Sequence, residues 1–200
     1  MRRRTLAIAL CGCAGPLRLH AQPAAPVRIR GTVVAVTDDR LTVKDRSGEV
    51  IQLLTPAALV INELYPIAMA DIRPGSFIGT AATTQPDGTR RAVGVMVFPE
   101  AMRGTGEGDR PFDLGPQSTM TNATVSELVA VPSGRTLRLK HKDGEAAIVV
   151  PDDAPVVTLR RADRSLLVPG ASVSLTAQLV DGRPTVLRLS AGRNGFVLPY

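Results

Sequence analysis

The feature that most limits what this chain can fold into is an internal repeat. The segment Leu41-Thr-Val-Lys returns as Leu137-Arg-Leu-Lys, and the turn glycine Gly48 returns as Gly144, both 96 positions later. Two further landmarks keep the same order: Pro74-Gly75 and Pro169-Gly170, then Asp87-Gly88 and Asp181-Gly182. Chance similarity does not preserve the order of four landmarks, so we predict a duplicated structural unit.

Each repeat has the pattern of short β-strands. Apolar and β-branched runs are broken by Asp, Gly and Pro roughly every 8 to 12 residues. Strict alternation over residues 40–44 places Leu41 and Val43 on one face of a strand, and Leu137 and Leu139 have the same inward phase in the second repeat. The first repeat is expected to form strands over 28–36, 40–44, 49–54, 58–61, 76–82 and 91–98, with one or two helical turns within 63–71.

The predicted fold is all-β, with two tandem small OB-like antiparallel barrels joined by a Gly- and charge-rich linker. Five or six short strands per repeat favour a barrel, and a pair of β-sandwiches is the alternative. Near 70 residues, each unit is close to the lower size at which a domain without disulfides folds alone. The boundaries are a signal peptide over 1–21, a leader over 22–27, a first barrel over 28–98, a linker over 99–120, a second barrel over 121–191 and a tail over 192–200, whose Phe196, Val197 and Leu198 are expected to dock on a barrel.

The amino end has the three parts of an export signal. Arginines at 2–4 precede an apolar run over 6–14, and Leu19-His20-Ala21 suits cleavage after Ala21. Pro16, Arg18 and His20 end the apolar run short of the roughly 20 residues that a spanning helix needs. The sequence therefore predicts a periplasmic or secreted protein that is not transmembrane. A minority alternative is lipid attachment at Cys13, because Leu10-Cys11-Gly12-Cys13 approaches a lipoprotein-processing box.

Removal of this segment changes the charge and the redox chemistry. Four arginines leave with it and no acid does, so 24 basic residues fall to 20 against 18 acidic ones, and the net charge falls from +6 to +2. Both cysteines, Cys11 and Cys13, leave as well, so the remaining chain has no disulfide. Such a chain lacks the strong positive charge typical of a nucleic-acid-binding protein.

A resemblance follows from these landmarks. Gly31-Thr-Val-x-x-Val, Leu41-Thr-Val-x-Asp, Gly48 and Ile72-x-Pro-Gly75 resemble a family of bacterial extracytoplasmic small-barrel (OB-like) domains of unassigned function. The linker is similar to a segment in proteins of this kind that tend to carry His in place of Asp109 and Trp in place of Phe112. Such proteins sometimes carry automatic labels as metal transport permeases. Without a spanning helix after the signal this chain is not itself a permease, and loss of the histidine argues against direct metal handling.

The candidate chemical motifs are weak. After signal removal His141 is the remaining histidine, in a turn expected to be exposed, so we predict no metal site and no cofactor. The acids Glu107, Asp109 and Asp113 are not spaced as a calcium loop, and the glycines over 104–108 lack the Lys-Ser/Thr of a phosphate loop. One histidine between lysines is a poor catalytic base, so we predict no enzyme. With no Trp, two Tyr and four Phe, we also predict no nucleic-acid partner.

The linker is the region in which we place any functional surface. Loops longer than about 15 residues are usually functional or disordered, and this one carries charges of both signs and one aromatic. Either it is a solvated tether, or it is an ordered bridge with Phe112 and Leu114 buried between the barrels. The function predicted is a non-catalytic envelope binding module for a protein or glycan partner, and the alternative is an accessory or solute-binding component of metal or small-molecule transport. The candidate partner-binding residues are Arg103, Glu107, Asp109, Arg110, Phe112 and Asp113.

Overall fold

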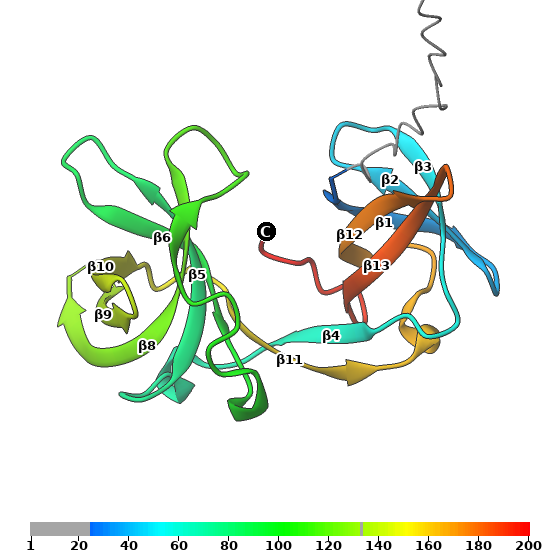
Figure 1. The fold of residues 1–200 in the computed structure, drawn as a ribbon. Coiled ribbons are helices and arrows are strands. Elements are labelled where there is room, and N and C mark those ends of the chain that lie inside the picture. The colour runs from blue at the N-terminus through cyan, green and yellow to red at the C-terminus, as the bar shows by residue number, and fades with distance from the viewer. Residues whose placement is uncertain (1–24, 133) are drawn as a thin grey trace, which may run out of the picture.

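A computed structural model describes residues 25–132 and 134–200 of the chain. The predicted signal peptide over 1–21, its cleavage after Ala21 and the alternative lipid attachment at Cys13 lie outside the described residues. Within the described ranges the elements are β-strands and short 3-10 turns, which confirms the predicted all-β class. Figure 1 shows two lobes connected by the strands β4 (Ile61–Pro66) and β11 (Val156–Ala162).

The remaining elements follow the order of the two repeats. The first repeat contains β1 (Val27–Val36), β2 (Arg40–Asp45), β3 (Val50–Leu54), the turn η1 (Met69–Asp71), β5 (Phe77–Thr84) and β6 (Arg90–Val97). The linker contains η2 (Glu100–Met102) and β7 (Gly108–Pro111). The second repeat contains β8 (Ser118–Val131), β9 (Gly134–His141), β10 (Gly144–Val150), the turn η3 (Arg164–Leu166), β12 (Ser172–Val180) and β13 (Arg183–Gly192).

Each lobe is a closed ring of five paired strands. In one, here called the terminal barrel, the pairing runs β1–β2–β3–β13–β12 and returns to β1. In the other, the central barrel, it runs β5–β6–β10–β9–β8 and returns to β5. Neighbouring strands are antiparallel except at one closing contact in each ring, where Leu54 pairs with Thr185 and Arg91 pairs with Val149 in parallel.

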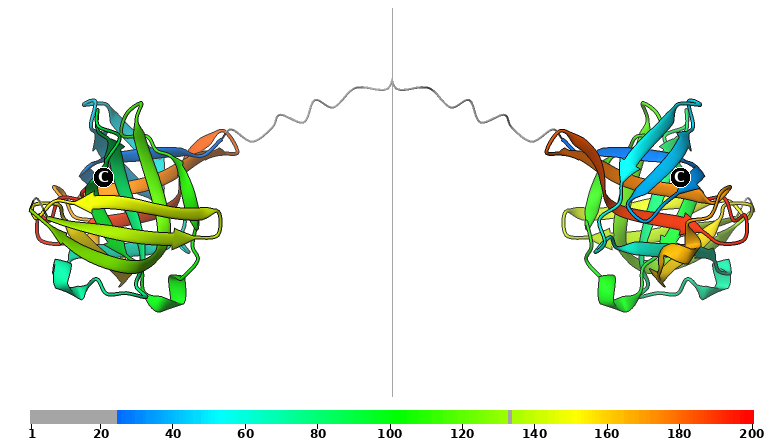
Figure 2. Two further views of the ribbon diagram at one scale, coloured as in Figure 1. Left: turned by 90° about the vertical axis from the view of Figure 1, so that its left-hand side faces the viewer. Right: turned by 90° about the vertical axis from the view of Figure 1, so that its right-hand side faces the viewer.

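This pairing departs from the prediction of one barrel per repeat. The terminal barrel takes β1–β3 from the first repeat and β12–β13 from the second, while the central barrel takes β5–β6 from the first and β8–β10 from the second. In the right-hand view of Figure 2 the facing lobe accordingly combines blue and cyan strands with orange and red ones. The ranges 28–98 and 121–191 therefore describe repeats of sequence, and each barrel draws on both.

The exchange between repeats takes place at β4 and β11. These strands pair antiparallel with each other, from Ile61 opposite Ala162 to Pro66 opposite Val157. β4 also pairs with β13 of the terminal barrel, and β11 pairs with β6 of the central barrel. Because residues 61–66 must stay extended to reach the other lobe, the expected strand over 58–61 starts later, and the expected helical turns over 63–71 shrink to η1.

The two barrels repeat each other in local detail. The Pro-Gly turn of the first repeat pairs with the second repeat, as Gly75 N donates to Val125 O at 2.8 Å. Its counterpart pairs in the opposite direction, as Gly170 N donates to Val33 O at 2.9 Å. Both glycines have φ of 89°, a conformation that only glycine adopts readily. Such matched geometry is what a duplicated unit with exchanged halves requires.

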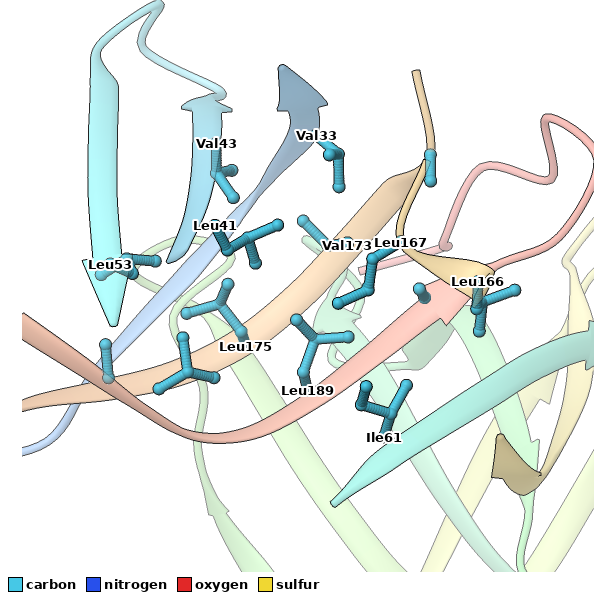
Figure 3. Close-up of a cluster of buried hydrophobic side chains, with 14 residues drawn as sticks. Val33, Leu41, Val43, Leu53, Ile61, Leu166, Leu167, Val173, Leu175 and Leu189 are labelled. Atoms are coloured by element: carbon cyan, nitrogen blue, oxygen red, sulfur yellow. The ribbon is translucent and has the colours of Figure 1, made fainter. Parts of the chain in front are cut away.

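A separate apolar core fills each barrel. Leu41 and Val43 are fully buried in the terminal barrel, and Leu137 and Leu139 are buried in the central barrel, which confirms their predicted inward phase. Figure 3 shows how Leu41 and Leu53 of the first repeat meet Leu175 and Leu189 of the second. Because these side chains come from both repeats, the core holds the exchanged strands together through burial of apolar surface.

A third apolar cluster and an ion triad around the buried Glu63 lie where the lobes join. Leu64, Val157, Leu159 and Leu198 form the cluster. On the same strand pair Glu63, whose side chain is 4% exposed, accepts hydrogen bonds from Arg160 and Arg193, with each of the four N–O distances at 3.1 Å. The hydrogen bond from Arg193, followed by that from Arg160, lowers the pKa of Glu63 below its ordinary 4.5 despite burial.

Two smaller expectations change as well. The linker over 99–120, read as free of regular structure, contains η2, β7 and the start of β8. β7 is only four residues long, from Gly108 to Pro111, which is too short to show a periodic pattern. In the tail, Leu198 is buried and Phe196 is half-buried as expected for docking, whereas Val197 is exposed. Strand β1 begins at Val27, the last residue assigned to the leader.

The strand exchange predicts that cutting the linker will not separate the two halves of the chain. A protease site placed in the exposed stretch Gly104–Gly106 should be cleaved completely, yet the fragments should elute from a sizing column as one species, because each barrel contains strands from both fragments. Urea should release two fragments from the same sample. Two separate folded species without denaturant would contradict the exchanged topology.

The ion triad predicts an acid-sensitive junction. A lowered carboxyl pKa stabilises the fold above the ordinary value of 4.5, and this contribution is lost as the pH falls through the lower folded value. Glu63→Gln should therefore lower the melting temperature by several degrees at pH 7, and the gap from the natural protein should narrow between pH 4.5 and pH 3. Glu145→Gln on the exposed edge of β10 is the matched control and should show no such gap. A gap that stays constant with pH would refute the role given to Glu63.

Candidate functional site

The linker is an ordered bridge, and its first part is fixed to the central barrel. Glu107 accepts a hydrogen bond from the backbone N of Lys142 in the β9–β10 turn at 3.1 Å. Asp109 accepts one from the Thr121 hydroxyl at 2.8 Å and forms an ion pair with Arg90 at 2.7 Å. Since β7 also pairs with β8 along four residues, the backbone in this stretch has a defined position.

The two arginines of this part face solvent and have different surroundings. Arg103 donates to the carbonyl of Gly75 at 2.9 Å and to the carboxylate of Glu100 at 2.6 and 2.7 Å, so it braces the Pro-Gly turn. Arg110 donates to the carbonyl of Gly106 at 2.8 Å, within its own loop. Its exposed guanidinium leaves the rest of its donors available to a partner.

The tip of the linker reaches the other barrel. Asp113 accepts hydrogen bonds from Arg30 at 2.6 and 3.0 Å and from Arg28 at 3.2 Å, both on the outer face of β1. The same two guanidinium groups lie over the ring of Phe112, at 4.9 Å for Arg28 and 5.4 Å for Arg30. A carboxylate held by an arginine fork beside an aromatic ring combines charge-assisted hydrogen bonds with cation–π contact.

Electrostatics around this contact favour negative charge. The hydrogen bond from Arg30, together with the charges of Arg30 and Arg28, lowers the pKa of Asp113. Burial lowers the pKa of Arg28; Asp113 opposes this effect, and the charges of Arg30 and Arg188 add to it. Three arginines therefore share one region of the terminal barrel, and Asp113 is the acid that pairs with two of them.

The C-terminal segment inserts between the lobes next to this contact. Tyr200 packs edge to face against Phe112, with ring centroids 6.0 Å apart, and Leu198 N donates to the Ser172 hydroxyl at 3.2 Å. A side chain at Gly94 of β6 would meet Tyr200 Cε1 at 3.1 Å, so the absence of one gives the ring its place on the central barrel. The Tyr200 hydroxyl oxygen is buried without a hydrogen-bond partner among the described residues.

A pocket of about 220 Å³ opens beside these residues. Its polar lining comes from Arg30, Thr32, Arg46, Ser172 and Tyr200, and its apolar lining from Val173, Val197 and Leu198; Gly31 completes it. None of these lining residues is acidic. The Arg30 side chain is 11% exposed, and its Nε is buried without an acceptor among the described residues.

A larger hollow of about 510 Å³ lies on the central barrel, at the β5–β6 turn. Arg91 and Val149 line it together with the turn residues, among them Asp87. Asp87 accepts hydrogen bonds from the Thr89 backbone and hydroxyl at 2.9 and 2.7 Å, and these bonds lower its pKa. The carboxylate thus stabilises its own turn, and the residues around this hollow form no cluster of donors like the one in the pocket beside Tyr200.

The six candidate residues divide into two groups in the structure. Phe112 and Asp113 come together at the seam between the barrels, while Arg103, Glu107 and Asp109 are spread over the central barrel and Arg110 is exposed. Phe112 and Leu114 are half-buried, less than the full burial expected of an ordered bridge. His141, expected in an exposed turn, ends β9 half-buried and accepts a hydrogen bond from Asp143 N at 3.3 Å.

The sequence reasoning missed the partners of the linker tip. Arg28 and Arg30 alternate with Ile29 and so were predictable as outward-facing residues of a strand, but nothing in the sequence indicated that Asp113 lies opposite them. Nothing in the sequence indicated that Tyr200 and Ser172 lie near this contact either. Across 25–132 and 134–200, no group of three or more His, Cys, Asp or Glu side chains is placed to hold a metal ion.

In comparisons with known proteins, no family model, no curated protein and no solved structure matches the chain. In the part of the chain that the structure describes, no helix is long and apolar enough to cross a membrane.

The insertion of Tyr200 predicts an unusual titration. Burial raises the pKa of its phenol above the ordinary value of 10.0. In a Tyr65→Phe variant Tyr200 is the only tyrosine, and no tryptophan interferes, so absorbance at 295 nm reports on it alone. The absorbance should begin to rise only at a pH well above 10. The stability that the protein gains from burying the neutral phenol should be fully present below pH 10 and should be lost as the pH rises towards the folded pKa. Titration close to pH 10 in the folded protein would mean that the ring is solvated.

Proposed function

We propose that the protein is a non-catalytic binding module, exported to the periplasm or secreted, that recognises an envelope protein or glycan. In this proposal its two barrels are OB-like units, and recognition uses the linker surface, defined as the exposed parts of Arg103, Glu107, Asp109, Arg110, Phe112 and Asp113. The proposed export rests on the amino-terminal pattern of the sequence.

One observation carries the binding role. The linker combines β-pairing to the central barrel with an ion-paired tip on the terminal barrel, so a surface of both charges and one aromatic ring is held in a defined geometry. Ordering such a loop costs conformational entropy, which its internal contacts must offset. A loop that served only as a tether would need neither the Asp113 clamp nor the bonds to Glu107 and Asp109.

A second candidate is a solute-binding component for transport. It is favoured by a specific arrangement: two lobes are joined by two paired strands, and the terminal barrel and the C-terminal segment line a pocket next to the place where the lobes meet. Clefts between domains are common sites for small ligands, and hinged lobes can close around them.

The binding role predicts position-dependent contact with a partner in the cell envelope. A photo-reactive residue in place of the exposed Gln117, at the end of the linker, should give a discrete crosslinked species in cells. The same residue in place of the exposed Gln52 on β3 is the matched control and should not give that species. An additional Arg110→Glu exchange should reduce the crosslink, because it reverses a charge at the surface. Absence of any linker-dependent species would count against the proposal.

A further inference from the structure

We infer that the pocket at the seam binds a carboxylate group, held by Arg30 and Arg46 next to the site that Asp113 occupies. This inference rests on the proposed binding function and names the chemistry of its ligand. The source of the carboxylate is either a free small organic acid or an acidic sugar within a glycan, and the two share the group that the pocket recognises.

The pocket is rich in hydrogen-bond donors. Arg30 and Arg46 supply guanidinium N–H groups, while Thr32 and Ser172 supply hydroxyls. No side chain in the lining is acidic, and Asp113 pairs with Arg30 from outside the lining. Two donors lack acceptors: Arg30 Nε and the Tyr200 hydroxyl are both buried without a hydrogen-bond partner among the described residues. A buried donor left unpaired costs free energy, and a ligand would recover it only if the side chains that cover these two atoms move aside.

Asp113 shows which kind of anion Arg30 binds. Its carboxylate takes two hydrogen bonds from Arg30, at 2.6 and 3.0 Å, in the two-point geometry for which guanidinium and carboxylate are matched. A ligand carboxylate in the pocket would use the donors of Arg30 that Asp113 leaves free, together with Arg46. The two carboxylates would then repel each other across a shared guanidinium.

The size and the apolar wall narrow the ligand further. At roughly 30 Å³ per water molecule, about 220 Å³ has room for a small acid or a single sugar ring. Val173, Val197 and Leu198 form one side of the pocket and suit the carbon face of such a ligand. Tyr200, whose ring packs against Phe112, also lines the pocket.

Calorimetric titration with D-glucuronate at constant ionic strength tests the inference, with neutral D-glucose as the control ligand. Glucuronate should bind and glucose should not. Arg46→Gln, which changes an exposed side chain, should weaken glucuronate binding about ten-fold, the loss expected from one charge-assisted hydrogen bond. Arg183→Gln at the distant β12–β13 turn removes the same charge and should leave affinity unchanged.

Asp113→Asn should change the affinity for glucuronate in the opposite direction to Arg46→Gln. It therefore distinguishes electrostatic competition in the pocket from a purely structural role of Asp113. Removal of the resident negative charge should tighten glucuronate binding several-fold, even if the variant melts at a lower temperature. Asp181→Asn, at an exposed turn whose φ of 50° asparagine tolerates, controls for the change in net charge. Weaker binding by Asp113→Asn, or an unchanged affinity of Arg46→Gln, would overturn the proposal.

The source of the carboxylate is resolved by two further ligands. Binding of free glucuronate identifies a small acid as sufficient and favours the solute-binding alternative, whereas binding of polygalacturonate alone identifies an acidic glycan. Binding of inorganic phosphate in preference to both, or of none of them, refutes the carboxylate site. A negative result here would leave the crosslink from position 117 unaffected, so failure of the pocket and failure of the binding function are distinguishable.

Discussion

The antiparallel pair of β4 and β11 is the interaction on which the rest of this structure depends. Where the two strands cross, each repeat gives its second half to the other barrel, and the buried Glu63 is placed between Arg160 and Arg193. On either side of this pair, β11 pairs in parallel with β6 and β4 pairs in parallel with β13. The seam between the lobes, with the linker tip and the pocket, exists because these two strands hold the barrels next to each other.

Local sequence predicted much of the fold because strand formation and inward phase are local properties. Alternation identified Leu41, Val43, Leu137 and Leu139 as core residues, and all four are buried. The choice of partner strand was not predictable in this way. Equivalent strands of two similar repeats offer each other nearly the same hydrogen bonds and apolar faces, so the pattern of one repeat does not distinguish its own second half from that of the other.

For the candidate site too, local features were predictable from the sequence and long-range contacts were not. The linker was recognisable by its length, glycines and charges, and its ordered state follows from contacts such as Asp109 with Thr121 and Arg90 that no spacing reveals. Its partners, Arg28 and Arg30, lie over 80 residues earlier in the chain on the outer face of a strand. Outward arginines on strands are usually solvated, and only the tertiary arrangement gives these two a carboxylate and an aromatic ring.

The exchanged halves also determine when the protein can begin to fold. Val27 pairs with Ala177, so the terminal barrel joins residues about 150 positions apart, and its core cannot close before β12 and β13 have been synthesised. At roughly 5 to 20 residues per second, the first three strands wait on the order of ten seconds or more for their partners. Non-local pairing of this kind is also intrinsically slow. The topology itself therefore keeps the leading strands without their partners until nearly the whole chain has been synthesised.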